Sequence, residues 1–148
     1  FFKRVSGVRD PNSFWFVIAD AAKERYLGQI DLADINWIDR RGILGIVIPD
    51  PANRGKGVGR AALSLLAHFA FNRLNLHKIE LKIFDYNTAG IRMYKKVGFK
   101  EEGRLREHIF RGGRYYDTLE MGLLASEFTG ADEFLPQDGD STGGMSSA

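Results

Sequence analysis

Hydrophobic and polar positions alternate with different periods along the chain, which predicts an alternation of strands and helices. Residues 14–20 form a short run rich in aromatic and β-branched side chains, and a second run follows a polar turn from about 25 to 35. These runs predict an antiparallel pair of strands. The run 43–48 is apolar on both faces and ends at Pro49-Asp50-Pro51, which predicts a central strand.

The second half of the chain predicts two helices and three further strands. Apolar residues at helical spacing from about 58 to 74 predict a long helix after a glycine-rich loop. Residues 78–84 alternate with period two, as a strand does, and Asn87 or Thr88 can cap a shorter helix that ends near Gly98. The last predicted elements are strands over 99–110 and 114–123, joined by a hairpin turn at Arg111-Gly112-Gly113.

This order, β-β-β-α-β-α-β-β, predicts an α/β (α+β) fold with one mixed sheet. Helices between the strands 43–48, 78–84 and 99–110 allow a parallel crossover, whereas the flanking strands are antiparallel. We expect one domain over residues 1–126. Residues 127–148 have little apolar content and no periodicity, so we expect a flexible acidic tail.

Composition narrows the function without defining it. The chain of 148 residues has no cysteine, which excludes disulfides, thiolate metal sites and a cysteine nucleophile. No apolar run approaches the roughly 20 residues that span a bilayer, and the amino end does not resemble an export signal, so we expect a cytoplasmic protein with no membrane partner. Four acids and no base lie in 131–148, so residues 1–130 carry +6 although the whole chain carries +2. A basic body suits a polyanionic ligand.

The segment 54–60, with the sequence Arg-Gly-Lys-Gly-Val-Gly-Arg, is the most informative part of the chain. Glycines at every second position let a backbone approach a ligand, and the N-terminus of the following helix presents unpaired N–H groups. Arg54, Lys56 and Arg60 add positive charge. We therefore predict a pyrophosphate-binding loop, with a glycine-rich helix entry that binds nothing as the alternative.

Two other phosphate-binding motifs fit this segment less well. An ATP-binding Walker loop requires Ser or Thr after the lysine, and Gly57 follows Lys56 instead. A dinucleotide-binding fingerprint requires a different glycine spacing directly after the strand, whereas residues 49–53 intervene here.

The loop and a second segment together resemble the GNAT superfamily of N-acetyltransferases. The pattern Arg54-x-x-Gly57-x-Gly59 is similar to the family's pyrophosphate signature, and residues 87–99 resemble its Asn-x-x-Ala-x-x-x-Tyr-x-Lys-x-Gly-Phe segment, with Gly90 in place of the usual Ala. Residues 102–117 resemble the branch of ribosomal-protein and spermidine acetyltransferases. The resemblance covers about residues 14–124 and implies a GNAT-like splayed sheet flanked by helices, with acetyl-coenzyme A (acetyl-CoA) as co-substrate and no metal.

The resemblance also implies roles for individual residues. Tyr94 is the predicted catalytic acid, because a phenol can donate a proton to the departing thiolate. Asn87 is expected to hold the pantetheine arm, although helix capping alone can explain it. Main-chain groups of the central strand are expected to bind the same arm as an added strand would. The predicted acetyl-CoA-binding residues are Ile46, Val47, Ile48, Arg54, Gly55, Lys56, Gly57, Val58, Gly59, Arg60, Asn87 and Tyr94.

The general base is not evident from the sequence. Many relatives carry a glutamate on the central strand, but residues 42–46 contain no carboxylate. Asp31, Asp34 and Glu80 are the candidates, and a chain of water molecules is the alternative. The three histidines have no metal-ligand spacing, so we predict no metal site.

The amine acceptor is also open. The family's first strand and first helix have no counterpart before residue 14, and we expect the chain to begin within the second helix. A protein N-terminal α-amino group is the favoured acceptor, because its pKa near 8 suits a site without an evident base. Polyamines, amino sugars and a non-catalytic acetyl-CoA sensor or subunit are alternatives. Nucleic acid is not expected as a partner, and a homodimer is left open.

Overall fold

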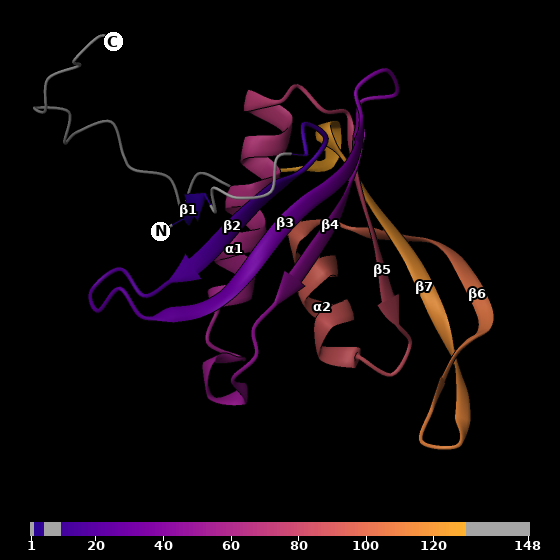
Figure 1. Cartoon of the computed structure of the whole chain (residues 1–148). Helices are drawn as coiled ribbons and strands as arrows, with labels where there is room; N and C mark the ends of the chain where they lie inside the picture. The colour runs from indigo at the N-terminus through magenta and orange to yellow at the C-terminus, as the bar shows by residue number, and fades with distance from the viewer. Residues whose placement is uncertain (1, 5–9, 130–148) are drawn as a thin grey trace, which may run out of the picture.

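The computed structural model describes residues 2–4 and 10–129, and these form one sheet with helices on one of its faces (Figure 1). The strands are β1 (Phe2–Arg4), β2 (Phe14–Ala19), β3 (Tyr26–Asn36), β4 (Arg41–Val47), β5 (Lys78–Phe84), β6 (Lys100–Arg111) and β7 (Arg114–Leu124). The helices are α1 (Val58–His68) and α2 (Thr88–Val97), with short helical turns at η1 (Pro51–Asn53), η2 (Phe69–Arg73) and η3 (Ala125–Glu127). The predicted α/β fold is confirmed.

The seven strands lie in the order β1-β2-β3-β4-β5-β7-β6. The pair β4 and β5, which α1 connects, is parallel, and the other neighbouring pairs are antiparallel. The chain leaves β5 through α2 and returns as β6 one position beyond β7. The sheet is therefore mixed, as predicted from the order of the elements.

The core lies between the sheet and its helices. Side chains that alternate toward this face are almost fully buried, among them Ile30 and Leu32 on β3 and Ile79 on β5. Leu63 and Leu66 of α1 pack against them in the same hydrophobic cluster. Most of the free energy of folding comes from this layer, since burying an aliphatic side chain contributes about 1.5–3 kcal/mol.

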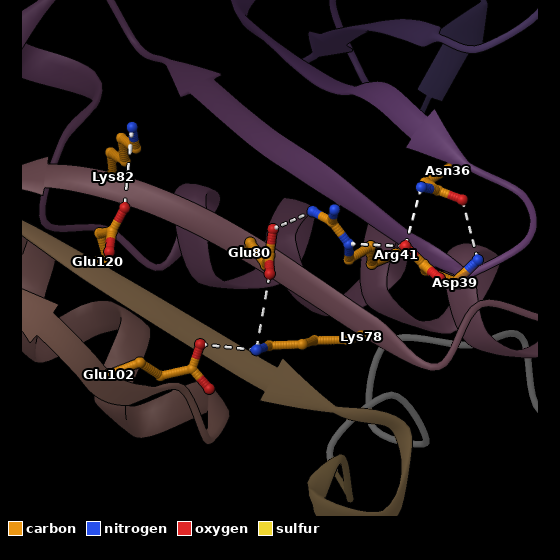
Figure 2. A network of polar contacts seen from close by, with 8 residues as sticks. All are labelled: Asn36, Asp39, Arg41, Lys78, Glu80, Lys82, Glu102 and Glu120. Atoms are coloured by element: carbon orange, nitrogen blue, oxygen red, sulfur yellow. Dashed lines mark hydrogen bonds and ion pairs between the residues drawn. The ribbon is translucent and has the colours of Figure 1, made fainter.

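The opposite face of the sheet carries charged side chains instead. Figure 2 shows a row of ion pairs there across β4, β5, β6 and β7. Glu80 contacts both Arg41, at 3.2 Å, and Lys78, at 3.6 Å. Lys78 also contacts Glu102 at 2.8 Å. We call this side of the sheet the helix-free face, because the described helices α1 and α2 lie on the other side.

The parallel pair β4 and β5 is joined at one end only. Its register holds from Arg41 opposite Lys78 to Ile43 opposite Glu80 and then stops, although both strands continue. Figure 1 shows β4 and β5 diverging beyond that point. The sheet is thus splayed as the family resemblance implied, and we call the region between residues 44–48 and 81–85 the β4–β5 opening.

Two expectations need correction, and one lies outside the described residues. Phe2–Arg4 pairs with β2 as a strand, whereas a helix was expected before residue 14. The long helix predicted over 58–74 changes to a π-helical turn at Phe69, where Leu74 N–H donates to Phe69 C=O. Phe69 packs edge-on against Phe14 and Phe16. The predicted tail lies almost wholly in 130–148, outside the described residues.

Candidate active site

The glycines of the loop 54–57 are required by its backbone. Gly55 and Gly57 have φ of 73° and 82°, in the left-handed region that L-residues with a side chain rarely adopt. A Cβ atom at either position would have no heavy atom within 4 Å, so both face open space. Gly59 differs, because a Cβ there would lie 2.9 Å from Met93 Sδ. Gly59 therefore serves the close packing of α1 on α2, and the first two glycines shape the predicted cradle.

The N-terminus of α1 is electrostatically prepared for an anion. Gly57 is its N-cap, so no side chain accepts from the first N–H groups, and its first turn contains no acidic residue. Arg60 stands in that turn instead, where the positive end of the helix dipole disfavours a cation. Lys56 is exposed beside it. A bound diphosphate would relieve both the unpaired donors and the concentration of positive charge.

Arg54 closes the loop from within. Its Nε donates to Ile48 C=O at 2.8 Å and its Nη2 donates to Pro49 C=O at 3.1 Å. These bonds tie the start of the glycine segment to the end of β4. The sequence suggested Arg54 as a phosphate-binding cation, but the guanidinium is engaged in holding the loop. Asp50 also fixes this connection, because its Oδ1 accepts a hydrogen bond from Ala52 N–H and caps η1.

Residues 46–48, which were predicted to bind the pantetheine arm, come after the part of β4 that pairs with β5. Ile46 and Val47 pair with Ile30 and Gln29 of β3 on one side, and on the other side β5 has already parted from them. Ile48 comes after the strand, and its carbonyl accepts from Arg54. The main-chain edge on the β5 side is therefore unpaired with a strand at 46 and 47, as added-strand binding requires.

Tyr94 lies within the helix layer of the core. Its side chain is only 8% exposed and packs edge-on against Phe99, with ring centroids 5.6 Å apart. Burial raises the pKa of Tyr94 to about 12. The phenol thus stays protonated at neutral pH, and because a thiol has a pKa near 8.5, hydrogen bonding to a thiolate is a larger part of its expected contribution than complete proton transfer.

Asn87 caps α2, as one of its two predicted roles requires. Its Oδ1 accepts from Gly90 N–H at 3.0 Å, which leaves the Nδ2 group as a donor for another partner. Gly90 is constrained by the same contact, since a Cβ there would lie 2.8 Å from Asn87 Nδ2 and from Ile83 Cδ1. In this chain, the space that an alanine methyl group would occupy is taken by the Asn87 amide and the end of the Ile83 side chain.

The three candidate bases have different surroundings. Glu80 is ion-paired with Arg41 and Lys78, and Asp34 is exposed with φ of 48°. Asp31 is half-buried, and burial raises its pKa to about 6. A Cβ at Gly45 would lie 2.8 Å from Asp31 Oδ1, so this carboxylate lies over β4 close to the opening.

A groove of about 350 Å³ lies on the sheet at the point where β4 and β5 part. Its three glutamates come from β5, β6 and β7, so no local sequence pattern indicated that they would lie together. Its lining residues are Ile43, Leu44, Glu80, Leu81, Lys82, Glu102, Glu120 and Met121. In the described part of the chain, no three His, Asp or Glu side chains are placed to hold a metal ion. None of the described helices is long and apolar enough to cross a membrane.

A glycine loop at a helix N-terminus beside a splayed parallel pair is the arrangement of an acyl-CoA-binding fold, and comparison with known proteins identifies the family. The model of the acetyltransferase (GNAT) domain matches residues 1–119. The chain therefore belongs to the GNAT family of acyl-CoA-dependent N-acetyltransferases, as its motifs predicted.

The proteins similar to this chain include spermidine acetyltransferases. Spermidine N(1)-acetyltransferase of Vibrio cholerae is 37% identical over 118 residues, which are 80% of this chain and 67% of that enzyme. The Escherichia coli K12 enzyme of the same name is 33% identical over 68% of this chain, and the match spans only 54% of the enzyme. A crystal structure of the Vibrio cholerae enzyme with CoA and spermine matches with a TM-score of 0.75 and 36% identity, covering 80% of this chain and 69% of that one.

Proposed function

We propose that this chain binds acetyl-CoA and transfers its acetyl group to a primary amine of a small polyamine-type molecule. The observation that carries the proposal is the position of the glycine loop 54–57 beside the β4–β5 opening. An unpaired strand edge and an anion cradle thereby follow one another along the chain. The similarity to spermidine acetyltransferases favours a polyamine over the protein α-amino group that the sequence alone had favoured.

The proposed path of the cofactor follows the chain. The diphosphate would lie at Gly55–Arg60 against the start of α1, and the pantetheine arm would run along residues 46–48 with Asn87 Nδ2 as a further donor. The thioester would then reach the opening near Tyr94. This path uses each predicted cofactor-binding residue except the Arg54 side chain, whose expected role becomes closure of the loop.

The chemistry at the opening is direct acyl transfer. The neutral amine attacks the thioester carbonyl carbon, a C–N bond forms and the C–S bond breaks. The amine loses a proton. The departing thiolate accepts a hydrogen bond, and finally a proton, from the Tyr94 hydroxyl. A polyamine amine with pKa near 10 is largely protonated at neutral pH, so this acceptor also requires a base.

A panel of acceptors tests the proposal. Release of CoA thiol is followed with spermidine, spermine, glucosamine and a short peptide with a free α-amino group. We expect kcat/KM for a polyamine to exceed that for the peptide by at least about tenfold, which corresponds to about 1.4 kcal/mol in transition-state binding. A preference for the peptide would support the protein-acetylating alternative. Tight acetyl-CoA binding without turnover of any amine would support a sensor.

A further inference from the structure

Asp31 occupies an unusual position on the helix-free face. On β3 it lies opposite Trp15 of β2 and Gly45 of β4, and its neighbours Ile30 and Leu32 point into the core. Gly45 is two residues beyond the last pair that joins β4 to β5. Because Gly45 has no side chain, the Asp31 carboxylate extends over β4 at the edge of the opening.

The surroundings of this carboxylate are apolar or uncharged. The same face of β2, β3 and β4 within two positions of Asp31 presents only Trp15, Val17, Gln29, Ala33, Ile43, Gly45 and Val47. Within residues 10–129 no hydrogen bond or ion pair engages the carboxylate. On β5 the same face carries Glu80, which lies opposite Ile43 and is held by Arg41 and Lys78, and Lys82, which contacts Glu120 at 3.8 Å.

This environment distinguishes Asp31 from the other carboxylates near the opening. Burial without a cationic partner disfavours its ionised form, and its pKa of about 6 makes it a stronger base than an exposed aspartate while leaving it ionised above pH 6. Glu80, Glu102 and Glu120 each contact a lysine, and Asp85, at the β5 side of the opening, contacts Arg104 at 3.6 Å. An unpaired carboxylate beside a reaction site is suited to accept a proton.

We propose that Asp31 is the general base of this site, taking a proton from the acceptor amine on the helix-free side of the β4–β5 opening. The proposal deepens the proposed function and rests on it. One ammonium proton passes to the Asp31 carboxylate, and the neutral amine attacks the thioester carbon as its C–S bond breaks. As the amide forms, a second proton leaves the nitrogen and reaches the departing thiolate through the Tyr94 hydroxyl, so that the products are the amide, the CoA thiol and protonated Asp31. Asp31 thereby supplies the carboxylate that residues 42–46 of the central strand lack.

The test compares Asp31→Asn with Asp34→Asn in the full chain. Asp34 lies on the same strand, is exposed, and has a positive φ that asparagine tolerates. For Asp31→Asn we expect kcat/KM with spermidine to fall by at least about 100-fold and the acid limb near pH 6 to disappear, whereas acetyl-CoA affinity by calorimetry stays unchanged. Asp34→Asn is expected to retain the rate and the pH profile.

The outcomes separate the two proposals. If the wild-type chain acetylates spermidine and Asp31→Asn keeps both its rate and its acid limb, the base assignment is overturned and the proposed function stands. If the wild-type chain acetylates no amine at all, both are overturned. Equal losses in Asp31→Asn and Asp34→Asn would also contradict a specific role for Asp31.

A second variant moves the carboxylate without removing it. In Gly45→Ala the new methyl group would lie 2.8 Å from Asp31 Oδ1, so the carboxylate must rotate away. We expect a loss of about tenfold in kcat/KM in the wild-type background and no further loss in Asp31→Asn, because interacting residues are not additive. The same loss in both backgrounds would show that Gly45 acts independently of Asp31 and would contradict the proposal.

Discussion

The two ends of the pair β4 and β5 differ in what holds them. At the joined end, residues 41–43 of β4 form a parallel ladder with residues 78–80 of β5. The Ile79 side chain is buried in the core on one face of this ladder, and ion pairs cross the strands on the helix-free face. At the other end the ladder stops, and the glycine loop, the edge at 46–48 and Asp31 lie around the opening. One strand pair thus has a core-supported end and an open end, where the proposed binding groups lie.

This difference explains how β4 and β5 can stay apart at the open end although no strand lies between them there. The core beneath the joined end fixes the direction of both strands, and Leu81 and Ile83 keep β5 attached to the core beyond the last β4 pair. Unpaired main-chain groups at the open end are then available at no cost in core packing. We expect substitutions at the joined end to change the free energy of unfolding and substitutions at the open end to change binding or turnover.

The largest expected effect is at Ile79, which is fully buried at the joined end. Ile79→Ala removes three methyl or methylene groups from the core and should lower the free energy of unfolding by about 2–5 kcal/mol in urea titrations. Ile43→Ala is the matched control, since Ile43 is 38% exposed in the same ladder, and it should cost less than about 1.5 kcal/mol. Similar losses in the two variants would contradict a core-supported joined end.

Gly57→Asp should have the next largest effect, this time on binding. The substitution places a negative charge and a strained left-handed backbone in the predicted cradle. We expect acetyl-CoA affinity by calorimetry to fall at least about 100-fold, or about 2.7 kcal/mol. Gly113→Asp is the control, because Gly113 has φ of 76° in the β6–β7 hairpin, also with nothing within 4 Å of a Cβ. Unchanged affinity in Gly57→Asp would exclude the cradle.

Tyr94→Phe should have a smaller effect, and it separates turnover from acetyl-CoA binding at the open end. Loss of one buried hydroxyl should lower kcat by about 10- to 100-fold and leave acetyl-CoA affinity within about threefold of wild type. Tyr116→Phe in the β6–β7 hairpin serves as the control. Equal kcat for wild type and Tyr94→Phe would remove the tyrosine from the mechanism.

The smallest expected effect comes from the ion pairs at the joined end. Glu80→Gln removes the partner of Arg41 and Lys78, but these side chains are partly exposed. We expect the free energy of unfolding to fall by less than about 1 kcal/mol, with a smaller difference in high salt. A loss above about 2 kcal/mol would mean that electrostatics rather than the core holds this end.

A pH titration of stability provides an independent measurement at the open end. The pKa of Asp31 is about 6 in the folded chain, above the ordinary value of 3.8, so the folded state binds the proton more tightly than the unfolded state. Stability from this group is therefore greatest below about pH 4 and is lost as the pH rises through 6. Asp31→Asn should raise the unfolding midpoint at pH 8 relative to wild type and change it little at pH 4.

Local patterns in the sequence predicted most elements because each has its own signal. Period-two runs, the Asn87 cap and Gly98 placed β5 and α2 within a residue or two of their observed bounds. The strand at Phe2–Arg4 was missed because three residues carry too little periodicity, and the π-helical turn at Phe69 depends on packing against Phe14 and Phe16 from another strand.

The site was predictable only where a motif is continuous in sequence. The loop 54–60 and the segment 87–99 marked the predicted cofactor path, but the sequence could not show that Arg54 bonds to Ile48 C=O. It also could not choose among Asp31, Asp34 and Glu80. That choice depends on which residues lie across the sheet, such as Gly45 opposite Asp31, and register is a tertiary property.

The proposed function depends on acetyl-CoA binding at the open end of the β4–β5 pair, and a crystal structure of the chain with bound acetyl-CoA would show whether it does. We expect the diphosphate within hydrogen-bond distance of main-chain N–H groups in 55–60 and the pantetheine arm along residues 46–48. A cofactor bound elsewhere, with this loop empty, would overturn the proposed cofactor site.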